Sequence, residues 1–331
     1  MSILKAIILL GGLGLIFGAI LAYASKKFAV EVDEREEQIL EVLPGANCGG
    51  CGFPGCGGLA AAIVKGEAPV NGCPVGGASV AVKVGEIMGV SASSEDKKVA
   101  AVKCMGTCEK AKNKYEYQGI KDCRAAAALI GGPKSCSAGC LGFGTCVSVC
   151  KFDAIKIEDG IAVVDEEKCV NCGKCMEACP KMLIVEKPAT KEVFVRCNSH
   201  EFGKAVKINC SAGCIGCGAC AKVCPVEAIT LDNKLAVVNQ EKCIGCKVCV
   251  EKCPTKVISG NISDRRKVTI NEELCIGCTA CVRQCKFGAI EGEKKQPHKV
   301  NEDKCKGCHL CLIKCKKGAM SLVDEEVKVT N

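Results

Sequence analysis

The sequence contains no tryptophan, and its aromatic content is only 3%. A chain of 331 residues is long enough to bury a sizeable core, and such cores normally include large aromatic side chains. The shortage predicts that something other than aromatic packing fills the interior. It also excludes an aromatic platform for stacking bases, and no nucleic-acid-binding module is recognisable, so we expect no nucleic-acid partner.

Nucleotide-cofactor signatures and histidines are scarce as well. No GxGxxG segment follows a predicted strand, so we expect neither NAD nor flavin in this chain. The three histidines stand in charged or loop-like segments, and we interpret them as surface residues rather than metal ligands: His200, His298 and His309.

Cysteine is what the sequence has in excess, with 33 residues. Such a content is typical of small secreted disulfide proteins, but this chain is long and its cysteines stand in tight CxxC groups. Thiols two residues apart converge on a metal, whereas a disulfide between them would be strained. Ligand type and spacing favour iron–sulfur clusters. A zinc-holding scaffold is the alternative, and it predicts a colourless protein without acid-labile sulfide.

Five runs of C-x2-C-x2-C-x3-C follow one another along the chain. This run is the ligand set of bacterial-type [4Fe–4S] ferredoxins, in which three cysteines hold one cluster and the fourth crosses to the neighbouring cluster. We predict these twenty residues as ligands: Cys169, Cys172, Cys175, Cys179; Cys214, Cys217, Cys220, Cys224; Cys243, Cys246, Cys249, Cys253; Cys275, Cys278, Cys281, Cys285; Cys305, Cys308, Cys311 and Cys315.

A sixth motif, which comes first along the chain, is irregular. CSAGCLGFGTCVSVC (136–150) aligns without a gap on CSAGCIGCGACAKVC (210–224), and Phe143 stands where Cys217 stands. The first copy has therefore lost its middle ligand. We expect Cys136 to replace it, so that this motif supplies Cys136, Cys140, Cys146 and Cys150.

Distances along the chain group the six motifs in three pairs. Within each pair 19 or 20 residues separate the motifs, whereas 35 and 22 residues separate the pairs. Apolar strands around turn residues predict a β-hairpin between paired motifs, as in AIKIEDGIAVVDEEKC and AITLDNKLAVVNQEKC. The crossing rule then assigns the fourth cysteine of each motif to the cluster of its partner motif.

Five cysteines remain outside these motifs: Cys104, Cys108, Cys123, Cys197 and Cys210. VKCMGTCEKAKNKYEYQGIKDC (102–123) and VRCNSHEFGKAVKINC (195–210) look like diverged copies of one element that precedes each cysteine block. Cys104, Cys108 and Cys123 could help to hold an eighth cluster. We favour the reading of all five as buried structural thiols.

Another cysteine set stands earlier in the chain, in LPGANCGGCGFPGCGGLAAAIVKGEAPVNGCPVGG. Cys48, Cys51, Cys56 and Cys73 have spacings that differ from those of a zinc ribbon, and the surrounding glycines let the backbone wrap around a bulky cofactor. We predict a separate [4Fe–4S] domain here, with helices at residues 32–43 and 59–65. Together with the six motifs it predicts about seven clusters.

The N-terminal residues 6–24 contain no charge, which is about the length of a helix that crosses a bilayer. Lys26 and Lys27 follow, so the positive-inside rule places the large C-terminal part in the cytoplasm. A cleaved signal peptide is the alternative, because residues 22–24 resemble a cleavage site. Against it, export of a folded cluster protein would need a twin-arginine signal, and no arginine precedes Arg35. We therefore expect a single-pass anchor in the cell membrane.

The net charge of +8 is concentrated near the C-terminus, where residues 286–317 contain nine lysines and only four acidic residues. An ordinary solvated surface is one reading. A docking face for an acidic redox protein is the other, because complementary charge steers encounter. We expect Lys299, Lys304 and Lys306 to contribute to such a face.

The order of anchor, LPGANCGGCGFPGC segment and ferredoxin motifs with GCLGFGTC resembles the B subunit of the Rnf ion-translocating ferredoxin:NAD oxidoreductase, in its longer form from anaerobes. The likeness covers essentially the whole chain, and its N-terminal third is the specific part. It implies an electron-transfer subunit that takes electrons from soluble ferredoxin and relays them to membrane subunits and NAD- or flavin-binding subunits. The coupling ion, Na+ or H+, stays open.

The first cluster segment alone is also similar to that of corrinoid iron–sulfur proteins, so a polyferredoxin that activates a corrinoid protein is the alternative function. It predicts a cobamide-binding partner and does not explain the anchor.

The expected fold is α+β with three tandem two-cluster ferredoxin-like units. The expected organisation is an anchor (1–27), a [4Fe–4S] domain (32–76), a linker (77–100), ferredoxin units 1 (101–190), 2 (191–262) and 3 (263–322), and a tail (323–331).

Overall fold

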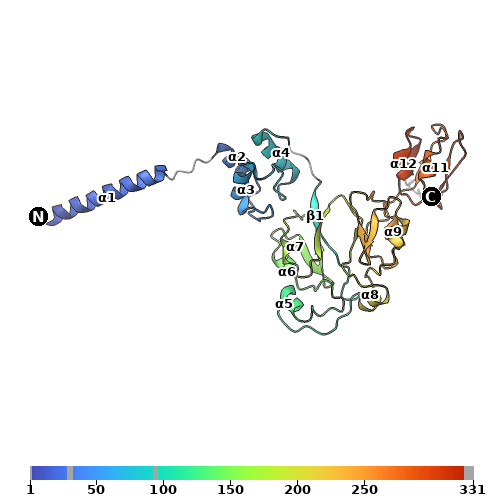
Figure 1. Cartoon of the computed structure of the whole chain (residues 1–331), viewed down its shortest axis with the longest axis horizontal. Coiled ribbons are helices and arrows are strands. Elements are labelled where there is room, and N and C mark those ends of the chain that lie inside the picture. Colours follow the sequence, from blue (N-terminus) through green and yellow to red (C-terminus); the bar gives the residue numbers. More distant parts are fainter. Residues whose placement is uncertain (1, 28–32, 92–95, 324–331) are drawn as a thin grey trace, which may run out of the picture. The chain divides into compact units, whose positions relative to one another are not determined.

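The computed structural model describes residues 2–27, 33–91 and 96–323, and most of the expected tail lies outside them. The chain divides into two compact units, residues 1–94 and 95–331. Figure 1 colours both along the sequence. Helix α1 (Ser2–Lys27) opens the first unit. In α1 the described side chains are those of Ile8 and residues 11–27. Within the described residues, no helix has the length and apolar content needed to cross a membrane.

The remainder of the first unit is a small helical domain of α2 (Glu34–Val42), α3 (Gly55–Val64) and α4 (Gly77–Met88). Helix α2 begins where the Asp33 carboxylate accepts a hydrogen bond from the Arg35 N–H, which satisfies one of its free backbone donors. The helices expected at residues 32–43 and 59–65 are confirmed, and α2 packs on both α3 and α4 (Figure 1).

Helix α4 is part of this domain. The sequence predicted a linker with a short helix around residues 80–88, and the helix is confirmed. It is not part of a linker, because Val84 is fully buried in one core with Ile39 of α2 and Leu59 and Ile63 of α3. The helix ends at Gly89, whose left-handed conformation lets the chain turn away without steric cost.

The second compact unit repeats one plan three times. In each ferredoxin unit an outer pair of antiparallel strands joins the two ends of the unit, and an inner hairpin joins the two cysteine motifs. Both hairpins predicted from sequence are confirmed. The outer pairs are β1 (Lys98–Val102) with β4 (Ile184–Pro188), β5 (Phe194–Val195) with β8 (Ile258–Ser259), and β9 (Val268–Ile270) with β12 (Met320–Leu322). The inner pairs are β2 (Ile155–Glu158) with β3 (Ile161–Val164), β6 (Ile229–Asp232) with β7 (Leu235–Val238), and β10 (Ile290–Glu291) with β11 (Lys299–Val300).

A short helix in each motif contains the third cysteine of that motif. Each helix begins after a residue in the left-handed conformation, such as Gly173 or Gly218, and five of the six end at the motif's fourth cysteine. The helices are α6 (Thr145–Ser148), α7 (Lys174–Ala178), α9 (Ala219–Val223), α10 (Val248–Lys252), α11 (Ala280–Gln284) and α12 (Leu310–Lys314). Two further helices, α5 (Cys123–Ala128) and α8 (Lys204–Asn209), lie in the segments that precede the first and third motifs.

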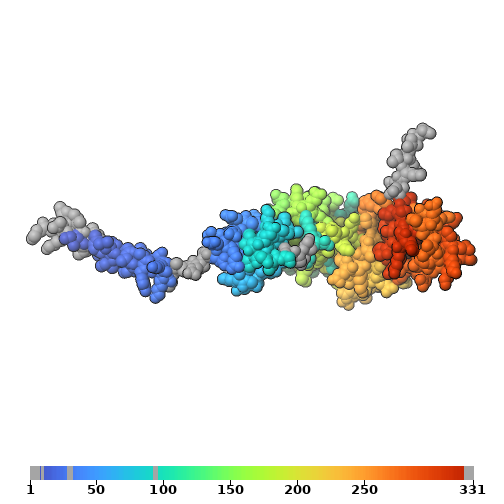
Figure 2. All heavy atoms as spheres, turned by 90° about the horizontal axis from the view of Figure 1, so that it is seen from above, coloured from blue at the N-terminus to red at the C-terminus, as the bar shows by residue number. Residues whose placement is uncertain are grey.

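Each ferredoxin unit has its own core, in which cysteines lie among small aliphatic residues. Consecutive segments accordingly stay grouped by colour in the space-filling view (Figure 2). The predicted scarcity of aromatic core residues is confirmed, because the largest fully buried side chains are aliphatic, with one histidine, among the described residues.

The helical domain offers a stability test, because neighbouring positions on α2 differ in burial. Ile39 is fully buried and Leu40 is 44% exposed. We expect Ile39→Ala to reduce the free energy of unfolding by about 2–5 kcal/mol through lost packing and the cavity left behind. Leu40→Ala should change it by no more than about 0.5 kcal/mol. Thermal unfolding of the two variants under anaerobic conditions checks this, and equal midpoints would contradict the packing of α2.

Candidate iron–sulfur sites

Three cavities in the ferredoxin units are each lined by four cysteines. In every case three cysteines come from one motif and the fourth comes from its partner motif, which is the crossing arrangement expected from the spacing. The empty spaces measure about 330, 330 and 910 Å3. The three groups are Cys169, Cys172, Cys175 with Cys150; Cys214, Cys217, Cys220 with Cys253; and Cys275, Cys278, Cys281 with Cys315.

Two further groups of four cysteines are identified by the electrostatic effect of neighbouring thiols on the pKa of one member. Burial raises the pKa of Cys249 to about 12, with the largest thiol contributions from Cys246, Cys243 and Cys224. Burial likewise raises the pKa of Cys311 to about 12, with contributions from Cys308, Cys305 and Cys285. These groups again combine three cysteines of one motif with the fourth of its partner.

Units 2 and 3 approach each other at these sites. Burial raises the pKa of Cys246, and Cys308 of unit 3 is the thiol that contributes most to this rise. A salt bridge between Lys286 and Glu227, 2.9 Å long, also joins the two units.

The first, irregular motif is arranged differently from the expectation. Burial raises the pKa of Cys146 to about 12, and the neighbouring thiols that add to it are those of Cys140, Cys123, Cys179 and Cys175. Cys136 is not among these neighbours. The position of the lost middle ligand is occupied by Phe143, whose ring packs on Tyr117 with the centroids 5.0 Å apart.

Local hydrogen bonds bring Cys123 to this motif. Cys123 is the first residue of α5, and Asp122 before it caps the helix by accepting from the N–H groups of Arg124 and Ala125. The Thr145 hydroxyl donates to Asp122 and accepts from the Cys123 N–H at 2.7 Å. Sequence reasoning left Cys123 among the surplus thiols. The aspartate immediately before it was the available signal, because it starts a helix at the cysteine.

The first compact unit gathers its own four cysteines around α3. Burial raises the pKa of Cys73, and the thiols of Cys56 and Cys51 add to the rise. The Cys56 N–H donates to the Asn47 side chain at 2.8 Å, and the N–H groups of Gly50 and Gly76 point at the sulfurs of Cys48 and Cys73 at 3.5 and 3.3 Å. The structure thus holds the predicted set in one loop cluster.

Backbone N–H groups aim at cysteine sulfurs in the ferredoxin units too. The N–H groups of Ala100, Ala228 and Ala289 donate to Cys169, Cys224 and Cys285 at 3.2–3.3 Å. Such donors stabilise thiolate charge and tune the potential of a cluster. Within the described residues no three side chains are placed as ligands of a single metal ion. A [4Fe–4S] cluster takes four cysteine thiolates around a larger volume, so cavities lined by four cysteines fit it.

One of the histidines contradicts its assignment to the surface. His298 is 1% exposed, its N–H donates to the Cys275 sulfur at 3.5 Å, and its Nδ1 lies 3.6 Å from the same sulfur. The β10–β11 hairpin buries the ring, because Gly292 leaves no side chain where the imidazole packs. His200 is exposed as expected, and His309 is half-buried.

The five surplus cysteines, all expected to be buried thiols, differ in exposure. Cys104, Cys197 and Cys210 are buried as expected and Cys123 is half-buried, whereas Cys108 is exposed, so the expectation is wrong for Cys108. Of the predicted docking lysines, Lys299 pairs with Glu272 at 3.2 Å and Lys304 with Glu291 at 3.0 Å, and all four of these side chains are more than half exposed.

A repeated two-cluster ferredoxin fold with quartets of cysteines around cavities defines an iron–sulfur protein of the polyferredoxin class. Family models agree. The model described as "4Fe-4S dicluster domain" matches residues 135–183, 213–257 and 242–289, related models of the same description match 168–229 and 268–322, and one described as "Putative Fe-S cluster" matches 43–75.

Curated relatives define the family more closely. The B subunit of the Na(+)-translocating ferredoxin:NAD(+) oxidoreductase complex of Acetobacterium woodii is 51% identical over 79% of each chain. The corresponding protein of the proton-translocating complex of Clostridium ljungdahlii is 46% identical over 72% of this chain and 85% of that one, and that of Methanosarcina acetivorans is 43% identical over 72% and 91%. The chain belongs to this family of B subunits of ion-translocating oxidoreductase complexes, known as Rnf complexes.

A solved formate dehydrogenase, heterodisulfide reductase and formylmethanofuran dehydrogenase complex of Methanospirillum hungatei matches at 24% identity over 53% of this chain and 72% of that one. The TM-score of 0.26 is too low for this match to bear on the fold.

These sites can carry single electrons. A bound [4Fe–4S] cluster supplies one-electron chemistry, and the chain supplies thiolates that hold it, N–H groups that favour added negative charge, and burial that excludes water. Burial raises the pKa of Cys249 and of Cys311 to about 12, so these two thiols are protonated at neutral pH when no cluster is bound, and ligation must release their protons.

The crossing arrangement predicts a pattern of losses in double variants. Cys214 and Cys253 line one cavity, whereas Cys224 neighbours Cys249. We expect Cys214→Ala with Cys253→Ala to remove about four irons per chain, because both changes affect one cluster. Cys214→Ala with Cys224→Ala should remove about eight. Iron and acid-labile sulfide analysis measures both, and the reverse pattern would refute crossing.

Proposed function

We propose that this chain is the electron-relay subunit of a membrane-bound Rnf-type complex, and that it accepts electrons from reduced soluble ferredoxin. It passes them through its [4Fe–4S] clusters to NAD- or flavin-binding and ion-translocating subunits. The observation that carries the proposal is the series of cysteine quartets in one chain, supported by relatives whose names give this reaction.

The approach of Cys246 to Cys308 supports a continuous route between units 2 and 3. Electron transfer between clusters needs no acid, base or nucleophile from the chain. The protein would contribute by holding the clusters in position and by setting their reduction potentials. The clusters proposed for this relay are the seven predicted from sequence.

We place the chain at the cell membrane, with residues 6–24 as a single-pass anchor and the remaining chain on the cytoplasmic side. The support is the sequence itself: the segment is uncharged, it is long enough to span a bilayer, and two lysines follow it. Residues 2–27 are helical.

Ferredoxin is proposed to dock on unit 3. The cavity of about 910 Å3 in this unit is lined by the exposed Cys278 and by Lys314, Lys316 and Lys317. The predicted docking lysines Lys299, Lys304 and Lys306 belong to the same unit. The pairs that Lys299 and Lys304 make with carboxylates are exposed, so each is weak and can be exchanged for a carboxylate of a partner.

The decisive experiment is anaerobic purification of the tagged full chain from detergent-solubilised membranes of its host. We expect flavin-bearing membrane subunits to co-purify, together with NAD reduction that depends on reduced ferredoxin. A matched chain lacking residues 6–24 should appear in the soluble fraction without that activity. Recovery of the full chain alone, or with a cobamide protein and no NAD reduction, would contradict the proposal.

Charge reversal tests the docking surface. We expect Lys299→Glu, Lys304→Glu and Lys306→Glu together to slow reduction of the protein by ferredoxin roughly tenfold at low salt, with the difference shrinking as salt rises. Lys156→Glu is the control, because Lys156 in unit 1 is exposed and paired with Glu158 in the same manner. Stopped-flow absorbance measures the rates. Equal rates for the triple variant and the wild type at low salt would exclude this surface.

A further inference from the structure

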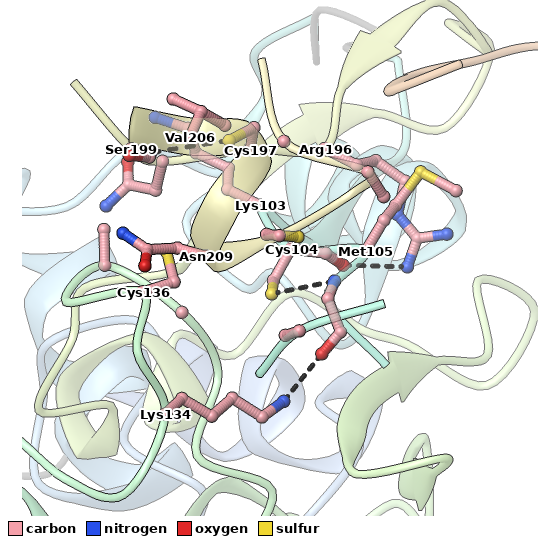
Figure 3. A pocket seen from close by; sticks show the side chains of 18 of the residues that line it. Lys103, Cys104, Met105, Lys134, Cys136, Arg196, Cys197, Ser199, Val206 and Asn209 are labelled. Carbon is pink, nitrogen blue, oxygen red and sulfur yellow. Dashed lines mark hydrogen bonds between the residues drawn. The ribbon is translucent and has the colours of Figure 1, made fainter. Parts of the chain in front are cut away.

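A fourth cavity of the same kind lies between ferredoxin units 1 and 2. Its lining includes four cysteines, of which three lie outside the six motifs and Cys136 belongs to the irregular motif: Cys104, Cys136, Cys197 and Cys210. The empty space inside this cavity is about 430 Å3, compared with about 330 Å3 in each of the two smaller motif cavities. Figure 3 shows Cys104, Cys136 and Cys197 around this space.

The four sulfurs act on one another. Burial raises the pKa of Cys136 to about 11, and the thiols that add to the rise are those of Cys197, Cys104 and Cys210. A methyl group built at Gly106 would lie 3.5 Å from the Cys210 sulfur and 3.6 Å from the Cys104 sulfur, so both sulfurs reach the same glycine. Three of the four side chains are less than 9% exposed.

An internal repeat builds the site. The segments VKC and SCSAGC of unit 1 align with VRC and NCSAGC of unit 2, so Cys104 corresponds to Cys197, and Cys136 to Cys210. The hydrogen bonds correspond as well: the Cys104 sulfur accepts from the N–H groups of Gly106 and Cys140, and the Cys197 sulfur accepts from those of Ser199 and Cys214, all at 3.4–3.5 Å. Each repeat thus contributes two cysteines with matching donors.

Three basic residues and one acidic residue, Glu201, line the cavity: Lys103, Lys134 and Arg196 are the basic ones. Lys134 is 5% exposed, and its ammonium donates to the carbonyl oxygen of Gly106 at 2.6 Å (Figure 3). It also donates to the carbonyl oxygen of Gly160 at 3.0 Å. Among the described residues no carboxylate forms an ion pair with Lys134. Arg196, on the opposite repeat, reaches the Cys104 carbonyl at 3.5 Å. Buried cations need a compensating negative charge, and a cluster held by four thiolates supplies one.

We propose that Cys104, Cys136, Cys197 and Cys210 hold an additional [4Fe–4S] cluster between ferredoxin units 1 and 2, and that Cys123 takes the place of Cys136 in the cluster of Cys140, Cys146 and Cys179. Each site then has four thiolates, as a [4Fe–4S] cluster requires. With this assignment eight quartets use every cysteine of the chain except Cys108, which is exposed.

The position of the added site gives it a role in transfer. Its Cys104 sulfur accepts a hydrogen bond from the backbone of Cys140, a ligand of the first cluster of unit 1, and its Cys197 sulfur accepts one from the backbone of Cys214, a ligand in unit 2. The cluster is therefore one hydrogen bond away from a neighbouring ligand on each side. It connects units 1 and 2 for single-electron exchange.

Iron and sulfide analysis of the full chain, purified anaerobically with its clusters, tests the proposal. We expect about 32 irons in the unaltered chain and about 28 in Cys197→Ala, in Cys210→Ala and in the variant carrying both changes, because the two residues share one cluster. Cys108→Ala is the matched control and should retain about 32. About 28 irons in the unaltered chain would overturn the proposal without any substitution. So would a double variant that loses about eight, or a Cys197→Ala protein that loses one zinc and no iron.

The exchange of Cys136 for Cys123 has its own test. Cys123→Ala should remove about four irons, and adding Cys136→Ala should remove about four more, because the two residues belong to different clusters. Phe143→Cys in the Cys123→Ala protein should restore the first loss, since Cys217 occupies the corresponding position of the second copy. A total loss of only about four irons in the Cys123→Ala, Cys136→Ala protein would place both residues on one cluster and refute the assignment.

Discussion

The constraint on which the rest of this structure depends is that each buried cysteine sulfur must face its neighbours and receive backbone N–H groups. A thiolate away from water is costly unless donors compensate its charge. The chain meets this requirement with tight loops: left-handed residues such as Gly173 and Gly218 start one-turn helices, and alanine N–H groups point back at sulfurs. Strands of two to five residues are sufficient to form each unit, because the cysteine groups occupy much of the core. Longer strands with large apolar side chains are therefore not needed to fill it.

Sequence alone predicted those parts of the fold that depend on local spacing. The hairpins between paired motifs and the helices of the first unit occur as expected, because turn residues, capping residues and apolar periodicity act within a few residues. The ligands of the irregular motif, in contrast, depend on contacts between residues that are far apart in the sequence. Alignment with the second copy showed that a ligand was missing at Phe143, but proximity in sequence favoured Cys136 as its substitute. In space, Cys123 reaches Cys146 through the contact between Asp122 and Thr145, which joins residues 23 positions apart.

His298 shows the same limit for a single side chain. Its neighbours in sequence are charged and polar, which is typical of a surface loop, yet the strand pairing of Ile290 with Val300 folds the hairpin over the ring. The backbone N–H of His298 donates to the Cys275 sulfur, and the ring nitrogen Nδ1 lies 3.6 Å from that sulfur; the motif itself encodes neither contact. Potentials in this family of sites therefore depend on residues that cysteine spacing cannot identify.

Pairing between repeats explains why the surplus cysteines are buried. A repeat that carries two cysteines ahead of its motif cannot complete a four-thiolate site alone, whereas two such repeats facing each other can. Unit 3 is preceded by no comparable element: residues 260–274 contain no cysteine, and the unit meets unit 2 through Cys246, Cys308 and the Lys286–Glu227 salt bridge instead. The two junctions thus differ in kind. Between units 1 and 2 the chain encloses a cavity lined by cysteines and the buried Lys134, and between units 2 and 3 it brings existing motif cysteines close to one another. Transfer between units 1 and 2 then depends on Cys104, Cys197 and Cys210, which the regular motifs do not contain, whereas transfer between units 2 and 3 depends on motif cysteines alone.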